Sequence, residues 1–130
     1  MTVLIVEDNE GIRRLLRRTV AEIATDVWEC SDGIDSLEAY TVHRPDIVLM
    51  DVRMPKMDGL TATRLILRNH SAARIVMVTD YNDESMRGAA LEAGACGYVL
   101  KLNLLDLNQL IQTIIDQPNK MPNAAPFGPR

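Results

Sequence analysis

The sequence has few cysteines and no long apolar run, and each shortage excludes a class of protein. Two cysteines, Cys30 and Cys96, are too few for a disulfide framework and lack metal-ligand partners. No stretch of about eighteen apolar residues is present, so we expect no membrane span. Acidic residues begin at Glu7, too early for a secretory signal. We therefore expect a cytoplasmic protein.

Excess positive charge is also missing. The formal net charge of −4 argues against a nucleic-acid-binding surface. One basic cluster, formed by Arg13, Arg14, Arg17 and Arg18, is interpreted as a solvated helix face. A chain of 130 residues with 47% hydrophobic and 25% charged residues predicts one folded domain rather than a disordered chain.

Short apolar runs alternate with longer segments of helical period. The runs cover 3–6, 27–28, 47–50, 75–78 and 97–100, and the helical segments cover 12–23, 34–40, 60–66, 86–93 and 104–115. Continuous apolar runs are typical of strands buried on both faces. Strands alternating with helices predict an α/β fold, with a parallel sheet covered on both faces. Asp32 is expected to open the second helix, and Asp58 and Asp83 are the expected N-caps of the third and fourth.

The composition changes near the C-terminal end. Four of the six prolines fall in residues 118–130, together with asparagine and glycine. Such a composition predicts a flexible tail or linker over 118–130, after a single domain over 1–117.

Chemically versatile side chains stand at the ends of four predicted strands. Glu7 and Asp8 follow the first strand, Asp51 follows the third, Thr79 ends the fourth and Lys101 follows the fifth. Because the carboxyl ends of parallel strands share one edge, where α/β sheets bind ligands, we expect these groups to lie together. Carboxylates about 4 Å apart repel by roughly 4 kcal/mol, so such a cluster favours a hard cation such as Mg²⁺. An ammonium and a hydroxyl could stabilise a phosphoryl group that an aspartate accepts, so the pattern predicts phosphoryl acceptance.

These residues, in this order, resemble the receiver domain of response regulators, which is CheY-like. The motifs are Val-Glu-Asp at 6–8, Met-Asp-Val-Arg-Met-Pro-Lys-Met-Asp-Gly at 50–59, Val-Thr at 78–79 and Gly-Tyr-Val-Leu-Lys at 97–101. The stretch Gly-Ala-Cys-Gly-Tyr-Val-Leu-Lys at 94–101 is similar to the subclass with LuxR-type helix-turn-helix outputs. The resemblance implies a doubly wound (βα)5, flavodoxin-like fold with strand order 2-1-3-4-5.

The resemblance also implies a role for each site residue. Asp51 would be the phosphoacceptor, and Lys101 would bind the phosphoryl group. The carboxylates of Glu7, Asp8 and Asp51 would hold Mg²⁺. The backbone carbonyl of Arg53 would complete the protein's share of the metal ligands.

Control of an output is the function that the resemblance implies. Thr79 and Tyr98 would form a switch pair that responds to the phosphoryl group. The donor would be a sensor histidine kinase, and the chain would catalyse only its own phosphorylation and dephosphorylation. Phosphorylation would control transcription through a DNA-binding domain outside this chain, with a homodimer as a possible active form. The receiver itself would make no direct nucleic acid contact.

Two positions depart from the family pattern. Leu102 stands where many receivers carry a cis-proline, and Asp80 stands where a small residue is usual. An added anion at Asp80, if it points inward, predicts slower phosphorylation by small donors such as acetyl phosphate.

Two other functions stay open on the sequence. A pseudo-receiver would bind partners without phosphorylation. A metal-dependent phosphohydrolase with an aspartyl-phosphate intermediate would need a second acid two residues after the nucleophile, where this chain has Arg53. A dinucleotide-binding domain is excluded because acid, rather than a glycine-rich turn, follows the first strand.

Overall fold

A parallel sheet in the order β2-β1-β3-β4-β5 forms the centre of the protein, which is described by a computed structural model over residues 1–116. The strands are β1 (Thr2–Val6), β2 (Asp26–Cys30), β3 (Ile47–Met50), β4 (Ile75–Thr79) and β5 (Gly97–Leu100). The helices are α1 (Glu10–Val20), α2 (Ser36–His43), α3 (Gly59–Asn69), α4 (Glu84–Ala93) and α5 (Leu107–Asp116). The predicted α/β class and strand order are confirmed, whereas the predicted tail over 118–130 lies outside the described residues.

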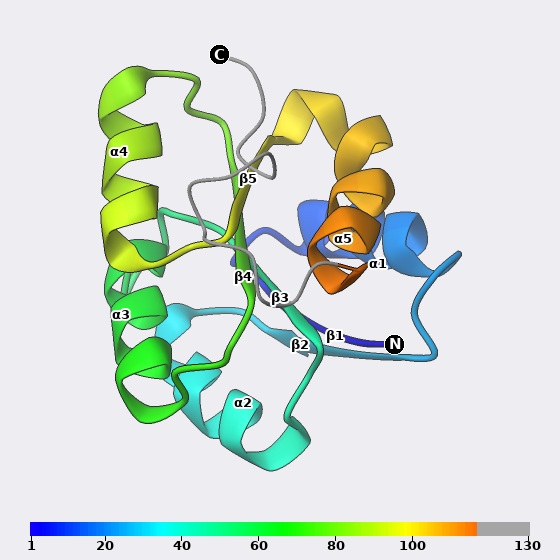
Figure 1. Cartoon of the computed structure of the whole chain (residues 1–130), viewed down its shortest axis with the longest axis horizontal. Coiled ribbons are helices and arrows are strands. Elements are labelled where there is room, and N and C mark those ends of the chain that lie inside the picture. The colour runs from blue at the N-terminus through cyan, green and yellow to red at the C-terminus, as the bar shows by residue number, and fades with distance from the viewer. Residues whose placement is uncertain (117–130) are drawn as a thin grey trace.

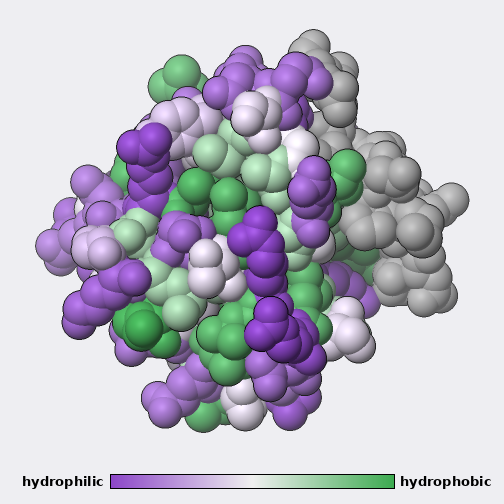
Figure 2. All heavy atoms as spheres, turned by 90° about the vertical axis from the view of Figure 1, so that its left-hand side faces the viewer, coloured by the Kyte–Doolittle hydropathy of each residue, from purple (hydrophilic) through white to green (hydrophobic). Residues whose placement is uncertain are grey.

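Helices cover both faces of the sheet. Figure 1 shows α1 and α5 on one side and α2, α3 and α4 on the other, and neighbouring helices within each layer are in contact. The space-filling view of the α3–α4 side shows polar side chains mainly toward the edges of that face, with apolar and weakly polar side chains across its middle (Figure 2). No helix within residues 1–116 is long and apolar enough to cross a membrane.

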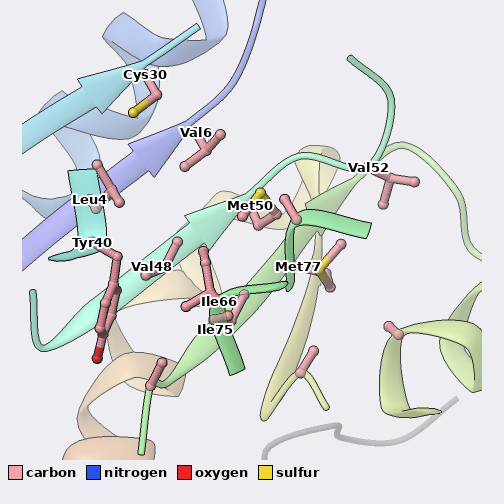
Figure 3. Packing of buried hydrophobic residues seen from close by; sticks show 14 of the residues in the cluster. Leu4, Val6, Cys30, Tyr40, Val48, Met50, Val52, Ile66, Ile75 and Met77 are labelled. Carbon is pink, nitrogen blue, oxygen red and sulfur yellow. The ribbon is translucent and has the colours of Figure 1, made fainter. Parts of the chain in front are cut away.

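The core consists of two layers because successive side chains of a strand point to opposite faces. In β1, Val3 and Ile5 pack toward α1 and α5, whereas Leu4 and Val6 pack toward the other helices. Figure 3 shows part of this second layer, with Leu4 and Val6 near residues of β3, β4 and α3. Both faces of the central strands are therefore buried, which explains their continuous apolar runs.

Aspartates begin two of the helices as predicted. Asp58 Oδ1 accepts a hydrogen bond from the Thr61 backbone N–H at 2.8 Å, and Asp83 Oδ1 accepts one from that of Met86 at 2.7 Å. Each bond satisfies one of the N–H groups that a helix start leaves without a partner.

The last helix starts later than the sequence predicts. A 3₁₀ segment covers Lys101–Asp106, with a non-helical residue at Asn103 (φ −117°, ψ 37°), and α5 begins only at Leu107. Leu104 is nevertheless 9% exposed and packs in the core. The apolar spacing thus identified the buried face, but it did not distinguish a 3₁₀ turn from an α-helix.

Candidate functional site

The carboxyl ends of β1 and β3 bring three acidic side chains together. Val6 of β1 pairs with Met50 of β3 in the sheet, so Glu7 and Asp51, the next residues of the two strands, lie side by side. The Asp51 backbone N–H accordingly donates to the Val6 carbonyl at 2.9 Å. One carboxylate oxygen from each of Glu7, Asp8 and Asp51 lies within 4.8 Å of the others. The predicted acidic cluster is present.

Lys101 joins this cluster from the end of β5. Its Nζ lies 2.9 Å from Glu7 Oε1 and 3.1 Å from Asp51 Oδ1. The side chains of Glu7 and Asp51 are only 1% and 7% exposed, so both ion pairs lie out of bulk water. Removing one partner of such a buried pair leaves an uncompensated charge. Lys101 therefore stabilises two carboxylates at once.

The surroundings of Glu7, Asp51 and Lys101 shift the pKa of each group. Burial raises the pKa of Glu7 to about 7, and it also raises the pKa of Asp51. Burial alone would lower the pKa of Lys101, but its contacts with Glu7 and Asp51 outweigh burial and raise it. A further positive charge close to the carboxylates would favour their ionised forms.

The residues present fit a hard divalent cation. Glu7 Oε1 is buried and makes no hydrogen bond of good geometry, and its one cationic contact among the described residues is Lys101. The donors are carboxylate oxygens, the type that Mg²⁺ prefers. They open into a pocket of about 380 Å³, lined by Glu7, Asp8, Asn9, Ile12, Asp51, Arg53, Asp80, Tyr81 and Lys101. Arg53, predicted to supply a backbone carbonyl, thus lies on the same pocket as the acids.

Thr79 and Tyr98 lie beside this pocket rather than in its lining. The Thr79 hydroxyl oxygen accepts a hydrogen bond from the Tyr81 backbone N–H at 3.1 Å, and the Tyr98 hydroxyl donates to the Tyr81 carbonyl. Tyr98 is 4% exposed, its ring lies under the Arg87 guanidinium at 4.6 Å, and burial raises its pKa to about 12. Both residues of the predicted switch pair are therefore bonded to the backbone of one residue, Tyr81.

Tyr81 also has a side-chain contact across the pocket. The Arg53 guanidinium lies 4.8 Å from the centre of the Tyr81 ring, within the range of a cation–π contact. Arg53 follows β3 and Tyr81 follows β4, so the contact links the loops after the two strands. Tyr81 was not predicted from the sequence because its bonds to Thr79 and Tyr98 use backbone atoms, which leave no side-chain signal.

Asp80, the departure from the family pattern, is at the edge of the site. Its side chain is 71% exposed, and Oδ2 lies 3.9 Å from Lys101 Nζ. Most of its charge is thus screened by solvent.

Asp32, predicted to open the second helix, caps a 3₁₀ turn (Gly33–Asp35) ahead of α2 and also holds the loop after β3. Its carboxylate is buried and accepts backbone N–H bonds from Ile34, Lys56 and Met57 at 2.9, 2.9 and 3.0 Å. Burial opposes the charge, but these bonds outweigh burial and lower the pKa of Asp32. The loop that carries Arg53 is therefore tied to the end of β2.

Gly59 ends the same loop where the backbone passes close to the phosphoacceptor candidate. Its N–H donates to the Val52 carbonyl at 2.6 Å, and a Cβ at this position would collide with the Asp51 carbonyl oxygen. Only glycine allows this approach, so Gly59 contributes to the backbone position of Asp51.

The arginine cluster is only partly the solvated face that the sequence predicts. Arg14 is 63% exposed and pairs with Glu10 on its own helix, as a surface arginine would. Arg13, in contrast, is 19% exposed and turns toward Glu29 on β2. The helical spacing did not show which arginine points back to the sheet.

Comparison with known proteins agrees with this arrangement. Residues 3–115 match the response regulator receiver domain family. The chain is 38% identical over 99 residues to the chemotaxis protein CheY of Halobacterium salinarum, covering 76% of this chain and 82% of that protein. It is 36% identical over 115 residues to the response regulator GacA of Pseudomonas viridiflava, covering 86% of this chain and 54% of that protein.

A solved structure gives the same result. The LuxR-family two-component response regulator of Aurantimonas sp. SI85-9A1 superposes with a TM-score of 0.83 at 32% identity, covering 88% of this chain and 84% of that one. The chain spans most of CheY but only about half of GacA, at 54%.

The fold, the acidic pocket and these matches together define the class of protein. The chain belongs to the response regulator receiver domain family of two-component signalling. Receivers are phosphorylation-controlled switches that histidine kinases phosphorylate, and they bind Mg²⁺ at an acidic pocket such as the one formed here by Glu7, Asp8 and Asp51.

Proposed function

We propose that Asp51 is the residue of this receiver that accepts the phosphoryl group. The observation that carries the proposal is the contact of Lys101 Nζ with Asp51 Oδ1 at 3.1 Å, beside two further carboxylates on one pocket. A carboxylate can act as a nucleophile and form an acyl phosphate. Asp51 is the member of the cluster that stands at the end of the central strand β3, and it shares the one lysine of the pocket with Glu7.

The reaction is a transfer from a phosphohistidine of a sensor kinase. An Asp51 carboxylate oxygen attacks the phosphorus in line, the new O–P bond forms, and the P–N bond to the histidine breaks. The electron pair of that bond stays on the imidazole nitrogen. The Lys101 ammonium contacts the transferred oxygens, and water later hydrolyses the acyl phosphate to restore the carboxylate. The chain thus catalyses its own phosphorylation and dephosphorylation.

Mg²⁺ is the cofactor that the pocket would hold. Glu7, Asp8 and Asp51 would supply carboxylate oxygens, and Arg53 would supply its backbone carbonyl. When bound, the ion supplies positive charge beside the phosphoryl oxygens. The buried Glu7 Oε1 supports this assignment because it has no hydrogen bond of good geometry among the described residues.

Thr79 and Tyr98 form the switch in this proposal. Thr79 is fully buried and its hydroxyl oxygen accepts from the Tyr81 N–H, and in this proposal the hydroxyl moves toward a phosphoryl oxygen on Asp51 and away from that N–H. Loss of that bond frees the backbone to which Tyr98 is also bonded. Phosphorylation would therefore change the packing of the loop after β4 and of the Tyr98 ring together.

The role of a phosphoacceptor implies the partners of this chain, and the composition of the sequence implies its domain limits. The kinase is the phosphodonor, and the receiver covers residues 1–117 ahead of a linker over 118–130. Transcription through a DNA-binding domain is the proposed output, and this receiver is proposed to make no nucleic acid contact itself. Both cysteines carry free thiols, which fits a cytoplasmic setting.

A homodimer is the proposed phosphorylated form. Three large apolar side chains, Leu15, Leu102 and Leu105, are 45%, 92% and 100% exposed, and they line a groove of about 390 Å³ between α1 and the segment after β5. We expect beryllofluoride, a phosphoryl mimic, to raise the mass measured by light scattering to that of a dimer. An unchanged mass would contradict the dimer but not phosphorylation.

Phosphorylation of the intact protein tests the assignment of Asp51. Acetyl phosphate and Mg²⁺ should add the mass of one phosphoryl group, read by mass spectrometry. Asp51→Asn and a metal chelator should each abolish the product. Asp26→Asn is the matched control. Asp26 is an exposed aspartate at the amino end of β2, away from the sheet edge that forms the pocket.

Two results would contradict the proposal. Labelling that persists in Asp51→Asn would place the acceptor elsewhere. A wild-type chain that is never labelled, yet binds a partner, would be the pseudo-receiver that the sequence also allows.

A further inference from the structure

The Arg13 side chain on α1 bonds the backbone of the acidic pair, Glu7 and Asp8, from outside the pocket. Arg13 Nη1 donates to the Glu7 carbonyl at 2.8 Å and to the Asp8 carbonyl at 3.3 Å. Its Nε donates to Glu29 Oε1 on β2 at 3.2 Å. One guanidinium thus bonds two consecutive residues whose carboxylates point into the pocket, while Glu29 orients it from the neighbouring strand.

We propose that Arg13, oriented by Glu29, is a positioning residue for Mg²⁺ binding, acting through the backbone of Glu7 and Asp8. The inference rests on the proposed function, because it assumes that this pocket binds the ion. Arg13 does not line the pocket, so it makes no direct contact with an ion bound there.

The acidic pair needs such support because it stands where the regular sheet ends. The Glu7 N–H still bonds to the Cys30 carbonyl at 3.0 Å, as in the ladder of β1 and β2. Two residues later the chain enters α1, whose N-cap is Asn9. Asp8, between these two points, is exposed, and the Arg13 bond to its carbonyl ties its backbone to α1 and β2. A held backbone reduces the conformational freedom that the carboxylates would otherwise lose when they bind a metal.

Two effects of Arg13 on Mg²⁺ affinity have opposite signs. As a cation near a cation site, it repels the ion, so on Coulomb grounds alone its removal strengthens binding. As a positioning residue, it prepares the ligands, so its removal weakens binding. The sign of the change in Kd therefore separates the two effects.

Arg17 provides a matched control on the same helix. Its Nε lies 2.6 Å from Glu29 Oε2, and its Nη2 donates to the Val27 carbonyl at 3.1 Å. Arg17→Met thus removes the same charge, an ion pair with the same glutamate and a bond to a backbone carbonyl. Neither of its bonds reaches the acidic pair, so any difference from Arg13→Met reflects the contact with Glu7 and Asp8.

The experiment measures the Kd for Mg²⁺ of the full chain by calorimetry, without any phosphodonor, together with urea unfolding in the absence of metal. We expect Arg13→Met to weaken binding on the order of tenfold, as for other residues that orient metal ligands, and Arg17→Met to change it by less than about twofold. Arg13→Lys should bind between Arg13→Met and wild type, because an ammonium can keep one carbonyl bond. Glu29→Gln should weaken binding in the same direction but by less, because it keeps the Arg13 charge and replaces the ion pair that orients Arg13 with a neutral hydrogen bond.

Four results would overturn the inference. Arg13→Met could bind Mg²⁺ as tightly as wild type or more tightly, or Arg17→Met could weaken binding equally. If Arg13→Met does not fold, unchanged affinity in both Arg13→Lys and Glu29→Gln overturns the inference in the same way. A wild-type chain that binds no Mg²⁺ would overturn the proposed function as well, so the two failures are distinguishable.

Discussion

The hydroxyl of Tyr98 donates a hydrogen bond to the backbone carbonyl of Tyr81, on the loop after the neighbouring strand. The Tyr81 N–H in turn bonds the buried Thr79 hydroxyl at 3.1 Å. One residue of the loop after β4 thus connects the ring on β5 with the hydroxyl at the end of β4, next to the acidic pocket.

Tyr98→Phe should destabilise the unphosphorylated protein by removing this bond. A hydrogen bond of this kind contributes about 1 kcal/mol, so the free energy of unfolding in urea should fall by about that amount. Tyr81→Phe is the control, since its hydroxyl takes no part in the contact with Tyr98. Equal stabilities of Tyr98→Phe and wild type would show that the bond does not hold the ring.

Asp80→Ala should speed phosphorylation by acetyl phosphate. Asp80 Oδ2 lies 3.9 Å from Lys101 Nζ, so its charge reduces the attraction of the pocket for an anionic donor. Exposed pairs contribute about 0.2–1 kcal/mol, which corresponds to a gain of roughly 1.4- to fivefold. Initial rates at saturating Mg²⁺ check this, with Asp80→Asn as the isosteric variant. Rates that match wild type in both variants would rule out an effect of Asp80.

Asp32→Ala should be among the most destabilising changes at a polar residue. It leaves three backbone N–H groups without their carboxylate partner at a buried position, and each costs about 1–3 kcal/mol unless water replaces it. Asp83→Ala, which removes a single N-cap bond, should cost about 1 kcal/mol. Urea unfolding of both variants checks the order. An Asp32→Ala loss no larger than that of Asp83→Ala would contradict the role of Asp32 in holding the loop.

Stabilisation by Mg²⁺ should increase with pH. Burial raises the pKa of Glu7 from 4.5 to about 7, so its contribution to stability is fully present below pH 4.5 and is lost as the pH rises through about 7. In the proposed site Mg²⁺ would bind the ionised carboxylate of Glu7 and thus compete with the proton. The rise in Tm on adding Mg²⁺ should therefore be larger at about pH 8 than at about pH 5.5.

Glu7→Gln is the control for this pH dependence. The amide does not titrate, so the metal-free protein should lose the part of its pH dependence that lies between 4.5 and about 7. A rise in Tm that is the same at both pH values in wild type would contradict the raised pKa of Glu7.

The sequence predicted the sheet and the pocket because both depend on simple rules. Apolar runs show which strands are buried, and residues just after parallel strands share one edge. Glu7, Asp51 and Lys101 could thus be grouped from strand ends alone, although they lie far apart in the chain.

Residues that act through the backbone could not be predicted in this way. Tyr81 contacts Thr79 and Tyr98 through its own amide and carbonyl, which every residue other than proline possesses. Arg13 differs from Arg14 only in the direction of its side chain, and the helical period placed both on one polar face. Such contacts depend on how helices and loops dock on the sheet.

The close approach of Gly59 to the Asp51 carbonyl restricts how this protein can evolve. Any side chain at position 59 has to displace the backbone of Asp51, whereas nothing lies within 4 Å of a Cβ added at Gly88. A saturation library selected for signalling should therefore retain almost only glycine at position 59 and a broad range of residues at position 88. Sequence drift in this receiver can thus proceed at position 88 but not at position 59, where it would move the main chain of Asp51.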